Sequence, residues 1–336
     1  MASAVSNSWN PRVLVMGPGG IKGLKILGFL SPIEDSGLLE KVDTYCGVSV
    51  GAILSLLLIT GYTVREIIGE AIMLDLFKDL ISFNIKTSVS QRGLLSSEPI
   101  RKRLTDLLLG KFGMIPTLEG LYLRTGKAFV AVTLNATDEE CVMMGPFTHQ
   151  HVSCIDATMF SMNIPFVFYQ LIYNEKTYVD GALANPYPID YFDDGNTDIL
   201  GIYLCSSKAV TRAIAPARID PLHPNTPIIQ RIEAEDTSTN TLSISSYWVK
   251  MVNSLLEQRR VHIMQHASSR CKNVSLETNT NDLIGVSLTI EDKVKMMTEG
   301  YNEGKAFLKQ LRDGIYRGPR ISEPQKYTYP QYYMNV

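Results

Sequence analysis

The sequence has few cysteines and almost no net charge, and each shortage excludes a class of protein. Five cysteines are dispersed singly among 336 residues, a pattern that does not suit a disulfide framework and fits a reducing compartment. The formal net charge of −2 gives no indication of nucleic-acid binding or of a general affinity for anionic membranes. With an apolar fraction of 45%, the chain can bury the core of an ordinary globular protein, in one large domain or two small ones.

Long apolar runs are also missing, both at the N-terminus and elsewhere. Residues 1–11 are polar, which argues against a signal peptide. The longest apolar run, residues 52–59, is far shorter than the roughly 20 residues that a membrane-spanning helix needs. We therefore expect a cytoplasmic protein without a signal peptide or a transmembrane segment, in which any contact with a membrane is peripheral.

Apolar patterning predicts alternating strands and helices along most of the chain. Near the N-terminus the order is strand, loop, helix, strand, turn and helix, which implies a parallel sheet with helices on its faces. Thr63, with Glu66 three residues later, and Thr289 are expected to begin two of the helices. The expected strands cover residues 12–16, 42–46, 127–135, 141–144, 177–180, 198–204 and 272–276, and the expected helices 21–30, 52–60, 62–80, 97–109, 155–163, 228–269 and 290–311.

The motif G-x-S-x-G occurs at Gly47, Ser49 and Gly51, between an apolar strand-like run and an apolar helical run. This context is typical of a nucleophile elbow, a sharp strand-to-helix turn that presents a serine. The two glycines would let the neighbouring elements approach closely, and Ser49 would lie at a helix N-terminus, where a developing anion is favoured. A plain strand-to-helix connection is the alternative, since Gly and Ser are ordinary turn residues.

A glycine-rich loop, residues 17–23 with the sequence GPGGIKG, lies between the first expected strand and its helix. Consecutive backbone N–H groups at a helix start form an anion-binding arrangement. A phosphate-binding P-loop would end in Gly-Lys-Ser/Thr, whereas here Gly23 is followed by Leu24, and the dinucleotide fingerprint fits only with its last glycine one position late. Beside a nucleophile elbow, the pattern favours an oxyanion hole.

A third stretch, residues 177–188, carries Asp180 from a short strand into a loop at Gly181. The carboxylate would therefore lie at a strand end, and in parallel sheets active sites gather at the carboxyl ends of the strands. Asp-Gly is also a common turn dipeptide, so this stretch alone would indicate only a turn.

Taken in this order, the three stretches resemble the patatin-like phospholipase family over about residues 12–205. That family combines a glycine-rich loop ending in Lys/Arg-Gly, a G-x-S-x-G elbow and a later Asp-Gly-Gly/Ala; residues 156–168 also look like the family. The resemblance implies a three-layer α/β/α fold with a mostly parallel central sheet, followed here by a largely helical C-terminal extension. The expected divisions are a polar segment (1–11), the catalytic core (12–205), a Pro-rich connection (206–227), a helical part packed on the core (228–314) and a Tyr-rich tail (315–336).

The resemblance and the residues together predict a catalytic dyad. Ser49 is expected to be the nucleophile and Asp180 the base, which requires that burial raise the pKa of Asp180 from about 4 toward neutrality. No metal or cofactor is expected. Pro18 stands where the family usually has glycine, and it has no N–H to donate. The expected oxyanion donors are therefore Gly19, Gly20, Ile21 and Val50, and the supporting motif residues are Gly17, Lys22, Gly23, Gly47, Gly51, Gly181 and Ala182.

The expected function is hydrolysis of fatty-acyl esters of lipids, of the phospholipase A2 or lysophospholipase type, through an acyl-enzyme on Ser49. Phospholipid is the expected substrate, and a peripheral membrane contact and a protein activator or assembly partner are compatible with this function. One alternative is an α/β-hydrolase with a Ser-Asp-His triad, for which His223, His262 and His266 lie downstream of the nucleophile. The other is a catalytically silent scaffold that binds partners through its C-terminal third.

Overall fold

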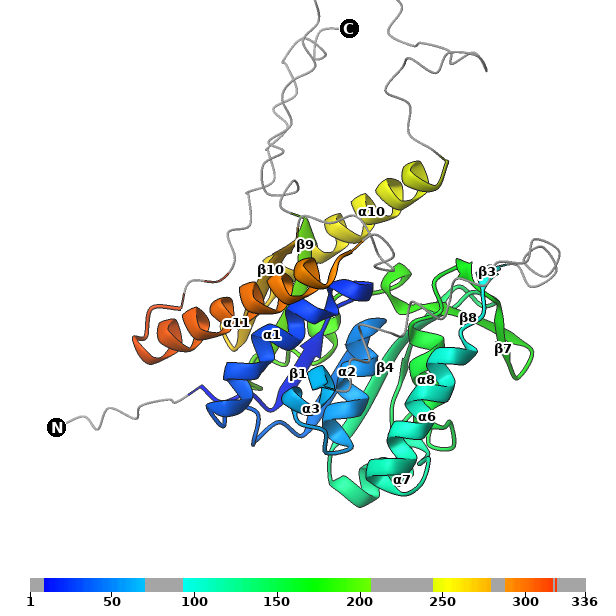
Figure 1. Cartoon of the computed structure of the whole chain (residues 1–336), viewed down its shortest axis with the longest axis horizontal. Coiled ribbons are helices and arrows are strands. Elements are labelled where there is room, and N and C mark those ends of the chain that lie inside the picture. Colours follow the sequence, from blue (N-terminus) through cyan, green and yellow to red (C-terminus); the bar gives the residue numbers. More distant parts are fainter. Residues whose placement is uncertain (1–8, 70–92, 207–243, 279–287, 317, 319–336) are drawn as a thin grey trace, which may run out of the picture.

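The central feature of the fold is an eight-stranded β-sheet (Figure 1). The computed structural model describes residues 9–69, 93–206, 244–278, 288–316 and 318. Five neighbouring strands of the sheet run parallel, as the alternation of strands and helices predicted. In sheet order they are β10 (Cys271–Thr278), β9 (Ile199–Ser206), β1 (Val13–Met16), β2 (Thr44–Val48) and β4 (Ala128–Asn135).

Antiparallel strands complete the sheet around β4. The strand β5 (Glu140–Met144) and the hairpin formed by β7 (Leu171–Tyr173) and β8 (Lys176–Asp180) both join β4 in this way. A separate two-stranded sheet pairs β3 (Gly93–Leu95) with β6 (Phe166–Phe168). The sheet is therefore mostly parallel but has one antiparallel end.

Helices cover both faces of the sheet. Successive residues of each strand point to opposite faces, so both faces carry apolar side chains that need cover. Leu14 and Met16 of β1 pack in one apolar cluster with helices α1, α2, α6 and α8, whereas Val13 and Val15 pack in another with Ile263 of α10. The three-layer α/β/α fold is thus confirmed. The helices are α1 (Gly23–Asp35), α2 (Val50–Ile59), α3 (Val64–Gly69), α6 (Glu98–Phe112), α7 (Leu118–Thr125), α8 (Cys154–Ser161), α10 (Ile244–His266) and α11 (Ile290–Arg312), with 3-10 turns η1 (Gly20–Lys22), η2 (Gly181–Leu183) and η3 (Pro188–Tyr191).

Two helix starts follow the capping pattern expected from the sequence. The amide of Glu66 donates to the hydroxyl of Thr63, whose own amide donates to the Glu66 carboxylate. Thr289 and Asp292 form the same reciprocal pair at the start of α11. These capping boxes satisfy donors that a helix N-terminus would otherwise leave unpaired. Of the helix expected over residues 62–80, the part from residue 70 lies outside the described residues.

The C-terminal part contributes a strand and a long helix to the core. The strand β10 pairs with β9 along its whole length, and α11 runs beside α1 (Figure 1). The sequence predicted both elements but not the elements that they contact in the fold, because the sequence of a short strand does not indicate which strand it will pair with. The boundaries proposed between the divisions of the chain stay a prediction.

A buried ion pair connects α1, α11 and β10. The side chain of Lys25 on α1 is only 3% exposed, and its Nζ lies 2.8 Å from Oε1 of Glu303 on α11. The same ammonium group donates to the main-chain oxygen of Glu277 on β10, at 2.5 Å. A lysine that is buried to this extent needs such partners, since an unpaired charge would be costly to remove from water.

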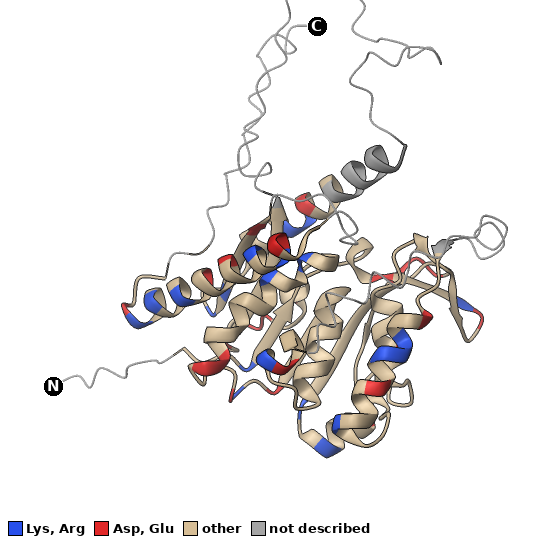
Figure 2. Ribbon diagram, viewed as in Figure 1, with Lys and Arg blue, Asp and Glu red and all other residues tan. Residues whose placement is uncertain are grey.

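Charged residues of both signs are interspersed along α11 and α6 (Figure 2). On α6, for example, Arg101 is paired with Asp156 of α8, at 2.5 Å.

The contact between α1 and α11 is close because glycines face each other across it. A Cβ atom at Gly300 of α11 would overlap the main-chain oxygen of Lys25, and one at Gly28 of α1 would overlap that of Met297. Gly300→Ala should therefore lower the free energy of unfolding by about 1–3 kcal/mol, since overpacking of backbone forces the helices apart. Urea denaturation at equilibrium would measure the change.

Gly110 provides the matched control for that substitution. It lies inside α6, and a Cβ there would meet nothing within 4 Å. Gly110→Ala should raise the free energy of unfolding by up to about 1 kcal/mol, because alanine is the better helix former. If both variants shifted stability in the same direction, the close contact of α1 with α11 would not be the cause of the Gly300 effect.

Candidate active site

Ser49 occupies a strained turn between β2 and α2. Its backbone angles, φ 57° and ψ −122°, lie in a region that residues other than glycine rarely adopt, and its side chain is buried. The glycines two positions before and after it are sterically required. A Cβ at Gly51 would overlap the main-chain oxygen of Met16, and one at Gly47 would overlap the backbone of α2. The strand-turn-helix context expected from G-x-S-x-G is thus confirmed.

The register of β4 explains why Ser49 and Asp180 meet. Residues 131 and 132 of β4 pair with both β2 and β5, so these two strands lie on opposite edges of β4. Residues 133–135 pair with β5 and β8, which puts β8 on the same edge as β2. The strand β2 ends with Val48 opposite Val132, and β8, running the other way, ends with Asp180 opposite Thr133. The C-terminal ends of two opposed strands therefore converge at one point.

Asp180 is a buried carboxyl group in contact with the nucleophile candidate. It is 4% exposed, it accepts a hydrogen bond from the amide of Ala182 at 2.8 Å, and its carboxylate is a hydrogen-bond partner of the Ser49 side chain. Burial raises the pKa of Asp180 to about 6, against the opposing effect of these two hydrogen bonds. This is the direction expected for a carboxylate that acts as a base.

Gly181, directly after Asp180, lets the chain leave the sheet at this point. A Cβ there would overlap the main-chain oxygen of Val132 on β4. The short turn η2 follows, and Ala182, its second residue, is buried against the face covered by α10. Packing at the end of β8 therefore requires glycine at position 181.

The glycine-rich loop lies against the start of α2. A Cβ at Gly51 would come within 3.0 Å of the main-chain oxygen of Gly17. Gly20 has φ 56°, in the left-handed region that favours glycine, and begins η1, which Lys22 ends before Gly23 begins α1. The loop therefore reaches the elbow from the neighbouring strand β1.

Several backbone donors at this point are free to bind an anion. The amide of Gly17 donates to Ile202, that of Lys22 donates to Gly19, and that of Ser49 donates to Oγ of Ser161 at 3.0 Å. Within the residues that the structure describes, the amides of Gly19, Gly20, Ile21 and Val50 have no protein acceptor, and neither has that of Gly51. The first four of these are the amides that the sequence suggested as oxyanion donors, and that role stays a prediction.

The histidines needed for a Ser-His-Asp arrangement do not reach this site in the described part of the chain. His262 and His266 lie on α10 with their ring centroids 4.5 Å apart, and Nδ1 of His266 interacts with the main-chain oxygen of His262. The side chain of Asp180 has Ser49 and Ala182 as its hydrogen-bond partners instead. His223 lies outside the described residues.

The described residues lack two other features. No group of three or more His, Cys, Asp or Glu side chains there could hold a metal ion. No helix there combines the length and apolar character needed to cross a membrane.

Ser161 and Asn163 are buried polar residues near the site that the sequence reasoning did not single out. They stand at the end of an apolar helix just before Pro165, within the segment whose resemblance to the family had been noted. Polar side chains in a largely apolar stretch were the available signal, since buried polar groups are normally hydrogen-bonded.

Comparison with known proteins gives matches over the same part of the chain. A family model described as patatin-like phospholipase matches residues 14–193. "Probable lipid hydrolase 463L" of Invertebrate iridescent virus 6 is 30% identical over 185 residues, 53% of this chain and 62% of its own length. An uncharacterized protein of Acanthamoeba polyphaga mimivirus is 24% identical over 193 residues, 56% of this chain and 64% of its own.

Among solved structures, VipD from Legionella pneumophila resembles this chain in fold. It has a TM-score of 0.51 and 16% sequence identity, covering 91% of this chain and 67% of that one. An identity this low supports the similarity of fold alone. The alignments with the two viral relatives extend over less than two thirds of the length of those proteins.

Proposed function

Because this chain belongs to the patatin-like phospholipase family, we propose that it hydrolyses fatty-acyl esters of lipids with Ser49 as the nucleophile and Asp180 as the base. The observation that carries the proposal is the contact between the Ser49 side chain and a buried carboxyl group whose pKa is raised to about 6. A general base is most effective when its pKa lies near the working pH. A carboxylate with this pKa is largely ionised at pH 7 and can still hold a proton during the reaction.

The proposed reaction has two halves. Oγ of Ser49 attacks the ester carbonyl carbon while Asp180 accepts the hydroxyl proton, giving a tetrahedral intermediate. The intermediate collapses as its bond to the alcohol oxygen breaks, and Asp180 returns the proton to the departing alcohol. Water then attacks the carbonyl carbon of the acyl-enzyme and gives a proton to Asp180. The bond from that carbon to Oγ of Ser49 breaks, Oγ takes the proton from Asp180, and the fatty acid is released.

The amides of Gly19, Gly20, Ile21 and Val50 are the proposed oxyanion donors. Each has no protein acceptor among the described residues. Preorganised donors of this kind stabilise charge that develops on the carbonyl oxygen, each typically by about 3–4 kcal/mol. The N-terminus of α2 adds its dipole at the same point. Pro18 removes one donor from the loop, but those four remain.

Glycerophospholipid or lysophospholipid is the proposed substrate class, at the level of an A2-type or lysophospholipase activity. This rests on the family and on the name of the iridescent virus relative, both of which refer to lipids. Residues 71–77, an apolar stretch that could line an acyl groove, lie outside the described residues. A dyad is preferred to a triad because Ser49 contacts Asp180 directly and neither His262 nor His266 is a partner of that carboxylate.

Labelling with a fluorophosphonate probe tests the proposal most directly. Intact-mass and peptide analysis should find one adduct, on Ser49, and the protein should release free fatty acid from at least one member of a panel of phospholipid, lysophospholipid and neutral glyceride. If the wild-type protein stays unlabelled and inactive even with phospholipid vesicles present, the proposal fails, and a catalytically silent scaffold that binds partners takes its place.

The activity should also depend on pH in a way set by Asp180. Because the carboxylate is the reactive form, kcat/KM should be level above pH 7 and fall below about pH 6, approaching tenfold per pH unit. A cosolvent that lowers the dielectric constant should move this limb to higher pH, since it disfavours the ionised form of a carboxyl group. A limb that did not move, or moved to lower pH, would indicate a histidine base, whose ionised form is the protonated one.

A further inference from the structure

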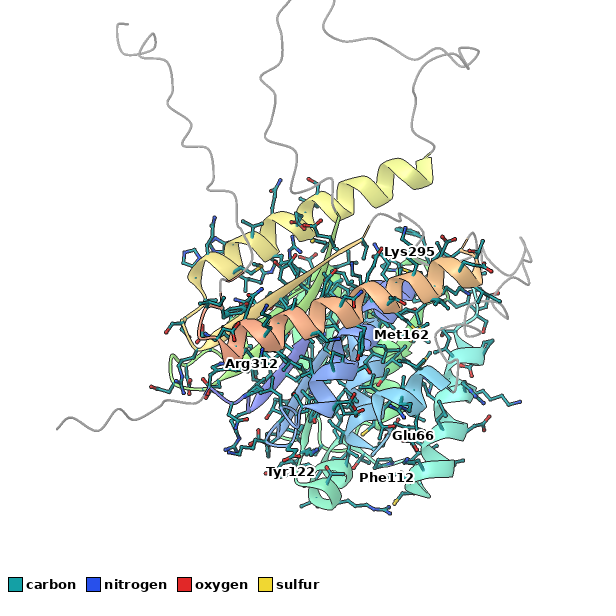
Figure 3. All side chains as sticks on the ribbon, turned by 60° about the vertical axis from the view of Figure 1, so that its left-hand side comes forward. Glu66, Phe112, Tyr122, Met162, Lys295 and Arg312 are labelled. Atoms are coloured by element: carbon teal, nitrogen blue, oxygen red, sulfur yellow. The ribbon has the colours of Figure 1, made fainter. Side chains whose placement is uncertain are left out.

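The end of α8 lies between the two proposed catalytic residues. Met162, labelled in Figure 3, marks this point, with Ser161 before it and Asn163 after it. Ser161 is fully buried and Asn163 is 2% exposed. Each forms hydrogen bonds with the backbone at the proposed active site, Ser161 with Ser49 and Asn163 with Tyr178 and Asp180. We call Ser161 and Asn163 the α8 clamp.

Ser161 holds the nucleophile side of the site. Its Oγ accepts a hydrogen bond from the amide of Ser49 at 3.0 Å. That amide belongs to the residue with φ 57°, so the bond fixes the peptide group at the most strained point of the elbow. Without the Ser161 hydroxyl, the buried amide of Ser49 would lose its hydrogen-bond acceptor at the end of α8.

Asn163 holds the base side. Its main-chain oxygen accepts from the amide of Asp180, and its Nδ2 donates to the main-chain oxygen of Tyr178, both at 2.9 Å. The neighbouring strand β7 pairs with β8 only as far as Tyr178. Asn163 therefore takes the place of a strand partner for the last residues of β8 and fixes the backbone that carries the carboxylate.

The clamp matters because β2 and β8 do not pair with each other. They meet end to end along one edge of β4, which is the strand they share. Thr133, opposite Asp180, also ties α8 to β8, since its hydroxyl lies 2.8 Å from the main-chain oxygen of Val179 and 3.3 Å from that of Phe160. The α8 clamp adds a direct connection from Ser49 through three consecutive residues to Asp180.

We propose that Ser161 and Asn163 are positioning residues that set the distance and orientation between Ser49 and Asp180. The inference rests on the proposed function of that pair. Without the clamp, the two strand ends keep their shared pairing with β4, but the hydroxyl and the carboxylate lose their fixed alignment. A misplacement of about 1 Å at reacting groups can reduce the rate about a hundredfold.

Ser161→Ala removes the acceptor of the Ser49 amide, and Asn163→Leu removes the Nδ2 donor to Tyr178 while it keeps the main-chain bond to Asp180; both test the proposal in the whole 336-residue chain. Each should lower kcat and the maximal rate of fluorophosphonate labelling by about 10- to 100-fold, while KM changes less than about threefold. Loss of alignment also weakens the Ser49 hydrogen bond that lowers the pKa of Asp180, so the acidic limb of the pH profile should move to higher pH. A purely structural loss would reduce the active fraction without moving that limb.

Ser55→Ala is the matched control. Ser55 lies on α2, is fully buried, and its hydroxyl has no hydrogen-bond partner among the described residues. The same chemical change there should leave kcat, KM and the pH profile at wild-type values. Thermal unfolding identifies which variants keep a cooperative transition, and Ser161→Ala, which removes one oxygen atom, decides the matter if Asn163→Leu does not fold.

The outcomes separate this inference from the proposed function. A wild-type protein that labels on Ser49, with clamp variants that fold and label at the wild-type rate with an unmoved pH limb, would overturn the clamp alone. A wild-type protein that neither labels nor hydrolyses any lipid would overturn the proposed function and the clamp together. Slower labelling with a shifted limb in the clamp variants, and not in Ser55→Ala, supports both.

Discussion

Replacing Ser49 with alanine should reduce kcat for lipid ester hydrolysis by about a millionfold, which places turnover below the detection limit of most assays. The hydroxyl is the atom to which the acyl group would be attached, and no acyl-enzyme can form without it. Any residual rate above that of water would come from binding and from the oxyanion donors alone. Fatty-acid release and fluorophosphonate labelling should both disappear.

The control must separate the loss of the nucleophile from damage to the elbow. Ser55→Ala makes the same change six residues later, at a buried hydroxyl without a partner, and should keep full activity. Ser49→Gly should be as inactive as Ser49→Ala but more stable by about 1 kcal/mol or more, because glycine accepts φ 57° without strain. If Ser49→Ala kept its labelling, another residue would have to be the nucleophile.

The elbow and the glycine loop could be predicted from the sequence because their geometry is local. A turn as sharp as the one at Ser49 requires glycines at fixed offsets, and Gly47 and Gly51 are needed for the contacts that they make in the structure. The burial of Asp180 was also expected, from the chemistry that a base requires rather than from any pattern in its neighbours. The catalytic roles of Ser49 and Asp180 stay proposals.

Ser49 and Asp180 lie close together because of the strand register, which cannot be predicted from the sequence. The position of β8 on the same edge of β4 as β2 follows from pairings between segments far apart in the chain. The edge position of β10 and the contact of α11 with α1 have the same origin. The glycines of that contact, Gly28 and Gly300, look in the sequence like ordinary interruptions of a helix.

Ser161 and Asn163 escaped notice for a related reason. A serine or an asparagine at a helix end is usually explained by local capping. Here the partners are the backbone groups of Ser49, Tyr178 and Asp180, which come close only in the folded chain. A buried polar side chain can be recognised from its apolar surroundings, but its partner cannot be identified before the fold is known.

Burial of Asp180 links the proposed activity to a cost in stability. An aspartate in the unfolded chain has a pKa near 3.8, whereas that of Asp180 is raised to about 6 in the folded protein. The folded state therefore binds the proton more tightly, and the free energy of unfolding falls as pH rises from about 4 to about 6. A difference of about two between these pKa values corresponds to a loss of about 3 kcal/mol in the free energy of unfolding. This loss is absent below about pH 4 and fully present above about pH 6.

Asp180→Asn should consequently lower activity and raise stability at the same time. The amide cannot take the proton of Ser49, so kcat should fall by about 10²- to 10⁴-fold, and the pH dependence near 6 should vanish. The Asn side chain keeps an oxygen that can accept from the amide of Ala182, as Asp180 does at 2.8 Å.

Denaturant titrations at several pH values would measure the stability of this variant. Its free energy of unfolding should exceed that of the wild type by up to about 3 kcal/mol at pH 7, with the difference shrinking toward zero near pH 4. Asp138→Asn is the comparison, because Lys176 lowers the pKa of that exposed carboxyl group, and removing it should not stabilise the protein at pH 7. An Asp180→Asn variant that was less stable than the wild type at pH 7 would contradict the proposal that ionised Asp180 lowers the free energy of unfolding. A variant that remained fully active would contradict the proposal that Asp180 is the base.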